Sequence, residues 1–263
     1  MLLSIVECND YRLASQNELS QAVVDKLSDN IEVVRSIFDH SAARMRNRGA
    51  RVASGEWLFF KDFDCAVDEN KILKIIDRES RREPGLAAIG GYYSGEPMTS
   101  LDRAYRKIQR IWTLRGVYKK RQGLLPLSNH LLGGSFLVKR SVFLELGGFS
   151  QVIGWGAEEP EFIMRLRDAG YYSALSLQLE TDHRSHMTLF PFLKRAWIQN
   201  YHRGLFNVSF QEVGSKKLKW FYLRNGQNFC PYSVLFFMTA HLAYRWGSFR
   251  RGVREREVQH GMV

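Results

Sequence analysis

The stretch EWLFFKDFD, residues 56–64, places two aspartates directly after a run of large apolar side chains. An apolar run of this length that ends in polar residues predicts a buried β-strand, with Asp62 and Asp64 at its carboxyl end. If the extended geometry continues, both carboxylates point to the same side, because side chains alternate along a strand. Such a pair suits Mg²⁺ or Mn²⁺ together with diphosphate oxygens. The alternative is a solvated acidic turn, since the motif is short and common.

The segments on either side of this strand alternate between apolar runs and helical patterns. We expect further strands at residues 2–6, 31–35 and 135–139, and helices at residues 15–28, 41–53, 141–146 and 160–169. Strands that alternate with helices at this spacing predict an α/β fold with a mostly parallel sheet.

A second group of carboxylates stands in GWGAEEPEF, residues 154–162. Glu158 and Glu159 precede the helix that Pro160 is expected to open, so they lie near free backbone amides and the positive end of the helix dipole. That position favours the ionised carboxylate, the form in which a general base removes a proton from a hydroxyl. The alternative is plain N-capping, which the same position favours without any catalysis.

Two histidines follow the apolar segment SALSLQLE. His183 and His186 lack the glutamate of the HExxH pattern, which argues against a zinc protease. One imidazole can join the two aspartates on a single metal ion, whereas an ordinary hydrogen-bonded histidine is the more frequent outcome.

Positive charge gathers in the last third of the chain. The 263 residues carry a formal net charge of +11, and residues 184–263 hold 13 basic and 3 acidic side chains, a net +10. This bias indicates a polyanion or an anionic membrane surface as a neighbour. With 45% hydrophobic and 25% charged residues, the composition is that of a globular protein and excludes wholesale disorder.

The three cysteines, Cys8, Cys65 and Cys230, are far apart and form no CxxC pair. An odd number at such spacing indicates a reducing compartment rather than a disulfide framework. Glu7 and Asp10 interrupt the N-terminal apolar run, so no signal peptide is expected. These features predict a cytoplasmic protein.

Residues 229–243 are largely apolar, and several arginines follow them. The stretch is too short to span a bilayer, since a spanning helix needs about 20 apolar residues. Aromatic and basic residues that flank a short apolar helix favour the headgroup region of an anionic membrane. The alternative is a helix that packs on the rest of the protein, with a solvated basic tail.

Three longer segments carry these motifs in a fixed order: AARMRNRGARVASGEWLFFKDFDC (42–65), LLGGSFLVKRSVFLELGGFSQVIGWGAEEPEFIMRLRDAGY (131–171) and DHRSHMTLFPFLKRAWIQNYHRG (182–204). Together they resemble family 2 glycosyltransferases with the GT-A fold. The second segment is also similar to β-1,4-galactosyltransferase-like and chondroitin-polymerase-like enzymes. The resemblance implies a Rossmann-like three-layer sandwich with a mostly parallel central sheet and a C-terminal helical extension. The composition changes after Gly214 to basic and aromatic residues, so we expect a catalytic domain, residues 1–214, and a basic, aromatic-rich helical segment, residues 215–263.

The resemblance also implies roles at the metal and the reacting hydroxyl. Asp64 matches the aspartate that ligates the metal, and Asp62 the one that contacts the ribose or a metal-bound water. His183 matches a histidine that can complete the metal site, with His186 as a close rival. Glu159, beside Glu158, falls on the position of the catalytic base in inverting members.

Further residues are implied in binding the nucleotide-sugar. Arg46 matches a basic residue near the diphosphate, and Trp155 lies in the GWG segment of the donor site. Glu7 takes the place of the acidic residue that ends the family's second strand. By that alignment the first βα unit of the family is missing and the catalytic domain is N-terminally truncated. A second departure is Glu159, which stands where the family usually has aspartate.

These observations favour a metal-dependent inverting glycosyltransferase that uses Mn²⁺ or Mg²⁺. It would move a sugar from a nucleotide-sugar, such as a UDP-sugar, to a hydroxyl of a glycan or lipid-linked acceptor, peripherally on the cytoplasmic face of the membrane. One alternative is a catalytically impaired partner subunit of the same fold. The other is a nucleic-acid-binding protein, to which the pI of 9.7 points. The acidic clusters at 62–69 and 158–161 would repel phosphate unless a metal intervened, so no nucleic acid is expected.

Overall fold

The computed structural model describes residues 1–8, 22–36, 41–120, 122–152, 156–183, 187–206 and 231–259. Its contacts divide the chain into two compact units. The first holds Met1–Glu96, Trp112–Gln151 and Glu158–Arg184, and the second holds Pro97–Ile111, Val152–Ala157 and Ser185–Val263. The domain boundary predicted at residue 214 lies outside the described residues.

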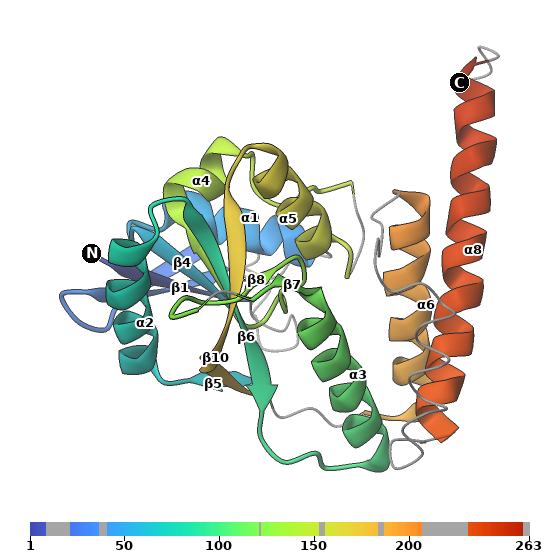
Figure 1. The fold of residues 1–263 in the computed structure, drawn as a ribbon, viewed down its shortest axis with the longest axis horizontal. Coiled ribbons are helices and arrows are strands. Elements are labelled where there is room, and N and C mark those ends of the chain that lie inside the picture. Colours follow the sequence, from blue (N-terminus) through green and yellow to red (C-terminus); the bar gives the residue numbers. More distant parts are fainter. Residues whose placement is uncertain are drawn as a thin grey trace. The chain divides into compact units, whose positions relative to one another are not determined.

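The first unit is built on one ten-stranded sheet (Figure 1). In spatial order its strands are β2 (Ala22–Lys26), β3 (Ile31–Ser36), β1 (Leu3–Cys8), β4 (Trp57–Asp62), β9 (Phe136–Lys139), β6 (Leu86–Ser94), β10 (Tyr172–His183), β8 (Leu127–Ser128) and β7 (Val117–Lys119). The remaining strand, β5 (Cys65–Val67), pairs with β10 outside this order.

Six of these strands share one direction, namely β3, β1, β4, β6, β10 and β7, and β9 runs against them between β4 and β6. Strands that run in one direction end at the same edge of a sheet. The carboxyl ends of β4 and β10, where Asp62 and His183 stand, therefore lie on the same edge. The predicted α/β fold is confirmed, with a large central sheet.

Helices cover both faces of this sheet (Figure 1). On one face, α1 (Ala42–Val52), α4 (Arg140–Glu145) and α5 (Glu158–Asp168) supply side chains to a cluster that includes Leu58 and Phe60 of β4. On the other face, α2 (Glu69–Arg82) packs in a cluster with Trp57 and Phe59. A strand that is buried on both faces has apolar residues at successive positions, which explains the sequence WLFF at residues 57–60 of β4. The predicted three layers are present.

Helix α1 lies unusually close to strand β1. A Cβ atom on Gly49 would stand 2.4 Å from Val6 Cγ1, so only glycine permits this approach. Arg46 is one turn earlier on the same face of the helix and is buried. The neighbouring Asn47 side chain donates to the Phe149 carbonyl oxygen at 2.7 Å and accepts from the Phe149 amide at 2.8 Å. These contacts fix α1 on its face of the sheet, from which the Arg46 side chain reaches Asp62 at the carboxyl end of β4.

The helix predicted at residues 15–28 is wrong in its second half. Residues 22–26 form β2, which pairs antiparallel with β3. A tight turn connects the two strands, because the Leu27 and Ser28 amides both donate to the Ile31 carbonyl oxygen. The adjacent valines of β2 fit a pleated strand better than a helix, since β-branched side chains are restricted in helices. Residues 15–21 lie outside the described residues.

The second unit contains the long helices α6 (Leu189–Leu205) and α8 (Pro231–Gln259), which lie side by side (Figure 1). The two helices touch backbone to backbone at two glycines. A Cβ on Gly204 would stand 2.2 Å from the Tyr244 carbonyl oxygen, and one on Gly247 would stand 2.1 Å from that of Tyr201. The expected C-terminal helix is therefore present. Part of α3 (Ser100–Gly116), up to Ile111, also belongs to this unit.

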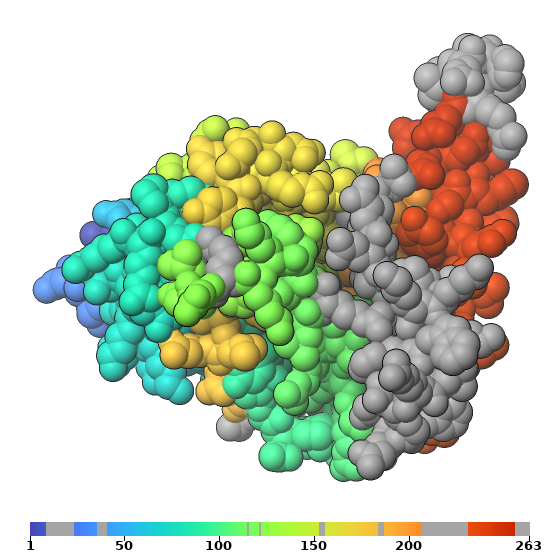
Figure 2. All heavy atoms as spheres, in the orientation of Figure 1, coloured from blue at the N-terminus to red at the C-terminus, as the bar shows by residue number. Residues whose placement is uncertain are grey.

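Helix α8 (red in Figure 2) carries a second apolar face besides the one packed on α6. This outer stripe of α8 consists of exposed side chains three or four residues apart: Leu235, Met238, Leu242, Trp246 and Phe249. At that spacing they share one side of the helix. Among the helices of the described ranges, none combines the length and the hydropathy that a bilayer crossing requires.

Candidate functional site

Two groups of ionisable side chains lie at the carboxyl edge of the sheet in the first unit. The first, called here the arginine cluster, consists of Arg46, Asp62, Glu158 and Glu159. The second, called the Asp64 cluster, consists of Asp64, Cys65 and His183. The structure thus brings together six of the residues singled out in the sequence, and it adds Cys65.

The arginine cluster joins three elements through one guanidinium. Arg46 of α1 reaches Asp62 at the end of β4 with 3.1 Å between Nη2 and Oδ1. Its other terminal nitrogen, Nη1, lies 2.8 Å from Glu159 Oε1 and 3.6 Å from Glu158 Oε1, both at the start of α5. One buried guanidinium thus contacts carboxylates from two other elements, and the arginine cluster connects α1, β4 and α5.

Electrostatics hold this cluster together. Burial alone would lower the pKa of Arg46, but the carboxylates of Asp62, Glu159 and Glu158 outweigh it and raise that pKa well above its ordinary value. One guanidinium faces three carboxylates, which leaves the cluster a formal charge of −2 when all are ionised. A buried ion pair of this kind is costly to break, since removing one partner leaves the other charge uncompensated.

Two glycines close over the carboxylates. A Cβ on Gly133 would stand 1.8 Å from Glu159 Oε1, and one on Gly134 would stand 2.7 Å from Asp62 Oδ2. Both distances are far below van der Waals contact, so any side chain here would displace the carboxylates. The pair at residues 133–134 therefore sets how closely the chain approaches the arginine cluster.

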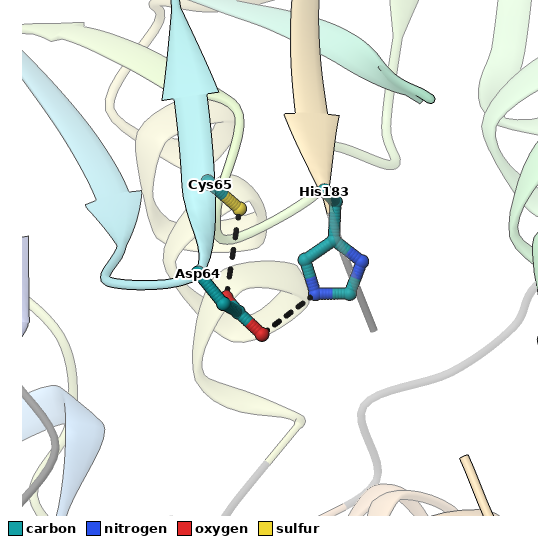
Figure 3. Close-up of side chains that lie close together, drawn as sticks. All are labelled: Asp64, Cys65 and His183. Atoms are coloured by element: carbon teal, nitrogen blue, oxygen red, sulfur yellow. Dashed lines mark hydrogen bonds and ion pairs between the residues drawn. The ribbon is translucent and has the colours of Figure 1, made fainter. Parts of the chain in front are cut away.

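The Asp64 cluster holds three kinds of metal-binding atom (Figure 3). His183 Nε2 lies 3.3 Å from Asp64 Oδ2, and Cys65 Sγ lies 3.8 Å from Asp64 Oδ1. All three ligand atoms lie within 4.8 Å of one another. Carboxylate, imidazole and thiolate are all ligands of divalent transition metals, so the residues fit a metal ion of that class.

The two aspartates point to different partners. Strand β4 ends at Asp62, and a turn at Phe63 and Asp64 leads into β5, so the strand geometry that would align both carboxylates does not continue. Asp62 pairs with Arg46, whereas Asp64 lies beside His183. The metal roles of Asp62, Asp64 and His183 stay predictions.

Tyr93 of β6 lies between the two clusters. Its ring stacks on that of His183, with 4.7 Å between the ring centroids. Its hydroxyl oxygen accepts a hydrogen bond from the Gly134 amide at 3.1 Å. Burial, together with the nearby Asp62 carboxylate, raises the pKa of Tyr93 well above its ordinary value. Tyr93 is therefore uncharged, and the stacking of its ring on that of His183 orients the imidazole.

Both described cysteines are free and buried near these clusters. Cys8, at the end of β1, stands opposite Asp62 in the sheet, and burial raises the pKa of its thiol to about 12. Burial, with the Asp62 and Asp64 carboxylates, likewise raises the pKa of the Cys65 thiol. In the protein without metal, both side chains are neutral thiols near pH 7.

The other predicted residues are placed as follows. Glu7 stands near the carboxyl end of β1, where its carboxylate lies 3.3 Å from Lys61 Nζ. Trp155 and His186 lie outside the described residues. The predicted roles of Glu7, Arg46 and Trp155 in nucleotide-sugar binding stay predictions.

Sequence reasoning missed Cys65, Tyr93 and the role of Gly133 and Gly134. Cys65 directly follows the second aspartate, but nothing local shows that it faces His183. Tyr93 stands at the end of an apolar strand, a position that could have drawn attention as a strand-end residue. The double glycine is visible as a motif, whereas its contact with carboxylates from two other segments is not.

A family model described as glycosyltransferase like family 2 matches residues 14–213, which span both clusters. The chain belongs to this family. The resemblance seen in the sequence segments is thereby confirmed. Within this family 2-like glycosyltransferase, the matched range includes every site residue named above except Glu7 and Cys8.

Known proteins resemble this family 2-like chain over part of their length. A protein of Haemophilus influenzae named "Uncharacterized glycosyltransferase" is 26% identical over an alignment of 145 residues, and the match covers 52% of this chain and 44% of that protein. The chain thus spans less than half of this curated relative.

Two solved structures show a more distant likeness. One is the mannosyltransferase PcManGT from Pyrobaculum calidifontis in complex with GDP-Man and Mn²⁺, with a TM-score of 0.47 and 15% identity over 85% of this chain and 56% of that one. The other is GalNAc-T7 with UDP, GalNAc and Mn²⁺, with a TM-score of 0.47 and 15% identity over 90% of this chain and 56% of that one. The family assignment rests on the sequence match.

Proposed function

We propose that this chain is a metal-dependent, inverting glycosyltransferase. It transfers a sugar from a nucleotide-sugar, with a UDP-sugar as the first donor to test, to a hydroxyl of a glycan or lipid-linked acceptor. The observation that carries the proposal is the pairing, at one sheet edge, of a carboxylate for proton transfer with a cluster of metal-binding side chains.

The charge of the site supports a requirement for a cation. The arginine cluster carries a formal −2, and Asp64 adds another negative charge beside it. A nucleoside diphosphate is itself an anion, so it would be repelled from this edge without positive charge from solution. Asp64 and His183 would hold Mn²⁺ or Mg²⁺, with Asp62 beside them, and the ion would neutralise the diphosphate as it leaves.

We assign the general base to Glu159. Its side chain is 11% exposed, whereas that of Glu158 is 5% exposed, so Glu159 is the better placed to meet an acceptor. Arg46 occupies Oε1 of Glu159, which leaves Oε2 to accept the proton. Gly133 lies close to the same carboxylate, because a Cβ atom there would stand 1.8 Å from Oε1. A base held in this way is oriented before the acceptor arrives.

The reaction then follows in one displacement. The acceptor hydroxyl gives its proton to Glu159, and the hydroxyl oxygen forms a bond to the anomeric carbon of the donor. The bond between that carbon and the diphosphate oxygen breaks on the opposite side, and the nucleoside diphosphate leaves with the bonding electrons. Attack from the opposite side inverts the anomeric configuration.

The test compares two neighbouring substitutions. Glu159→Gln keeps the shape and the contact with Arg46 but cannot accept a proton, so we expect turnover to fall about 10²–10⁴-fold, the usual contribution of a general base. Glu158→Gln is the matched control and should change turnover far less. Turnover is measured by release of nucleoside diphosphate from a panel of UDP- and GDP-sugars with Mn²⁺. Equal activity of wild type and Glu159→Gln would refute the assignment.

We also propose that the chain works peripherally on an anionic membrane surface, through the outer stripe of α8. Exposed arginines, Arg245, Arg250 and Arg254, stand on the same helix as this stripe. Trp246 stacks on Phe249 with 5.6 Å between ring centroids, which forms one broad aromatic surface. Apolar side chains bordered by cations favour the headgroup region, where each cation adds about 1 kcal/mol.

Vesicle sedimentation tests this second proposal. Leu242→Glu should weaken binding to vesicles that contain phosphatidylglycerol, and added salt should weaken binding of the wild type. Leu177→Glu is a matched control, because Leu177 is 62% exposed and Leu242 is 61% exposed. Equal sedimentation of wild type and both variants, or none with anionic vesicles, would contradict it.

A further inference from the structure

The Asp64 cluster contains a residue, Cys65, that the proposed function does not use. The Cys65 thiol lies beside Asp64 and on the same side as the His183 ring (Figure 3). It is buried, and it stands at the point where a divalent cation would be held.

Backbone pairing fixes this position of the thiol. Strands β5 and β10 are antiparallel, and Cys65 stands directly opposite His183 in their register. Directly opposed residues of an antiparallel pair project from the same face of the sheet, with Cβ atoms about 4.5–5.5 Å apart. The pairing of the two backbones therefore places the thiol near the imidazole, whichever rotamer each side chain adopts.

The three ligand atoms of the cluster lie close enough together to surround one small ion after small side-chain shifts. Around a tetrahedral ion bound at about 2.0–2.3 Å, neighbouring oxygen, nitrogen and sulfur ligands lie roughly 3.3–3.6 Å apart. His183 Nε2 lies 3.3 Å from Asp64 Oδ2, whereas Cys65 Sγ lies 3.8 Å from the other carboxylate oxygen, Oδ1, slightly beyond this range. One ligand atom from each of the three residues lies within 4.8 Å of the other two. Three such ligands leave a further position for an oxygen of the donor diphosphate.

We propose that Cys65 is a direct metal ligand and that it sets the metal preference of this site. A thiolate favours Zn²⁺ and Co²⁺ over Mg²⁺, which prefers oxygen ligands. When the metal–sulfur bond forms, the thiol S–H bond breaks and its proton passes to solvent. The inference rests on the metal-dependent function proposed above and names the residue that selects the ion.

Cobalt absorption tests it without measuring activity. Metal-stripped protein comprising residues 1–263 is titrated with Co²⁺ in the presence of UDP, and the near-ultraviolet charge-transfer band of a cobalt–thiolate bond is recorded. We expect this band in the wild type and its loss in Cys65→Ser. Cys8→Ser is the matched control, because Cys8 is also buried and close to Asp62 but is outside the Asp64 cluster; it should keep the band.

Competition provides a second readout. Excess Mg²⁺ should displace Co²⁺ from Cys65→Ser at a concentration at least about tenfold lower than from the wild type, a change of about 1.4 kcal/mol. Asp64→Ala should lose Co²⁺ binding altogether.

The outcomes separate this inference from the proposed function. If Cys65→Ser keeps the band, or if the wild type binds Co²⁺ calorimetrically without showing it, Cys65 is not a ligand, while a metal-dependent enzyme remains. If the wild type binds no Co²⁺ even with UDP, both the metal site and the inference drawn from it are wrong.

Discussion

The two clusters at the carboxyl edge of the sheet share acidic side chains but differ in what balances them. The arginine cluster contains its own cation, since Arg46 is 4% exposed and contacts three carboxylates. The Asp64 cluster combines a carboxylate with a thiol and an imidazole, which are donors for an ion from solution. Adjacent acidic groups therefore differ in what they can do: the arginine cluster connects α1, β4 and α5, whereas we propose that the Asp64 cluster binds a metal ion.

Loss of Asp64 should have the largest effect and should leave the fold intact. We expect Asp64→Ala to reduce metal-dependent turnover of a nucleotide-sugar at least about 10³-fold, because several kcal/mol of charge stabilisation depend on the ion. Its free energy of unfolding should change by only about 1 kcal/mol, because the Asp64 side chain is 28% exposed and the substitution removes a contact with His183. Nucleotide release assays and urea denaturation check both values. Wild-type activity in this variant would remove Asp64 from the site.

Loss of Arg46 should do the reverse and damage the fold. Arg46→Met leaves the carboxylates of Asp62, Glu158 and Glu159 without a counter-charge, so we expect a destabilisation of about 3–5 kcal/mol. Arg51→Met, at an exposed position on the same helix, is the control and should cost no more than about 0.5 kcal/mol. If urea denaturation finds the two variants equally stable, the arginine cluster does not hold the three elements together.

A buried carboxylate outside both clusters, that of Glu32, sharpens the comparison, because hydroxyl and amide groups hold it instead of a guanidinium. Glu32 of β3 accepts hydrogen bonds from Ser4 Oγ at 2.5 Å, from the Ser54 amide at 2.6 Å and from Ser54 Oγ at 2.8 Å. Burial alone would raise the pKa of Glu32, but these hydrogen bonds outweigh it and lower that pKa. We expect Glu32→Gln to cost about 1–3 kcal/mol near pH 7.

The pH dependence of that cost has a definite sign. A lowered pKa in the folded state means that the unfolded chain binds the proton first, so the contribution of Glu32 is fully present above the ordinary carboxyl pKa of about 4.3. It is lost as the pH falls below that value, through the lowered pKa of the folded protein. The difference between wild type and Glu32→Gln in urea denaturation should therefore shrink between pH 6 and pH 3 (about the range in which carboxyls titrate). The exposed Glu56→Gln is the control, and a difference that stays constant with pH would contradict the assignment.

The smallest expected effect is stabilisation by the metal itself. An ion that binds only the folded protein stabilises it by about 1.4 kcal/mol when its concentration is ten times its dissociation constant. Mn²⁺ should therefore raise the melting temperature of the wild type and of Arg51→Met, but not that of Asp64→Ala. A rise of equal size in Asp64→Ala would locate the ion elsewhere.

The features of the site that could be predicted from the sequence are those that depend on a single continuous segment. The apolar run before Asp62 predicted the strand and its edge, and the acidic start of α5 predicted where Glu158 and Glu159 stand. The α/β class followed from the alternation of elements, which is also a local signal. These predictions needed only side-chain periodicity and the ends of helices and strands.

The remainder depends on pairing between distant segments. Cys65 meets His183 only through the register of β5 on β10, and no local pattern encodes that register. The same reason explains the error at residues 22–26, where Val24 has helical spacing with its neighbours but is paired with Val34 of β3. Tertiary pairing overrides such weak local preferences.

The antiparallel strand β9 has a consequence for how the protein is assembled. Because β9 lies between β4 and β6, those two strands cannot join until residues 136–139 have been made. In a chain that grows at about 5–20 residues per second, the outer edge of β4 stays unpaired for several seconds after its synthesis. An unpaired edge of aromatic residues invites association with other chains. We therefore expect the newly made protein to be most prone to aggregation in this interval. The interval ends when the four residues of β9, Phe136–Lys139, have been made and pair with both β4 and β6.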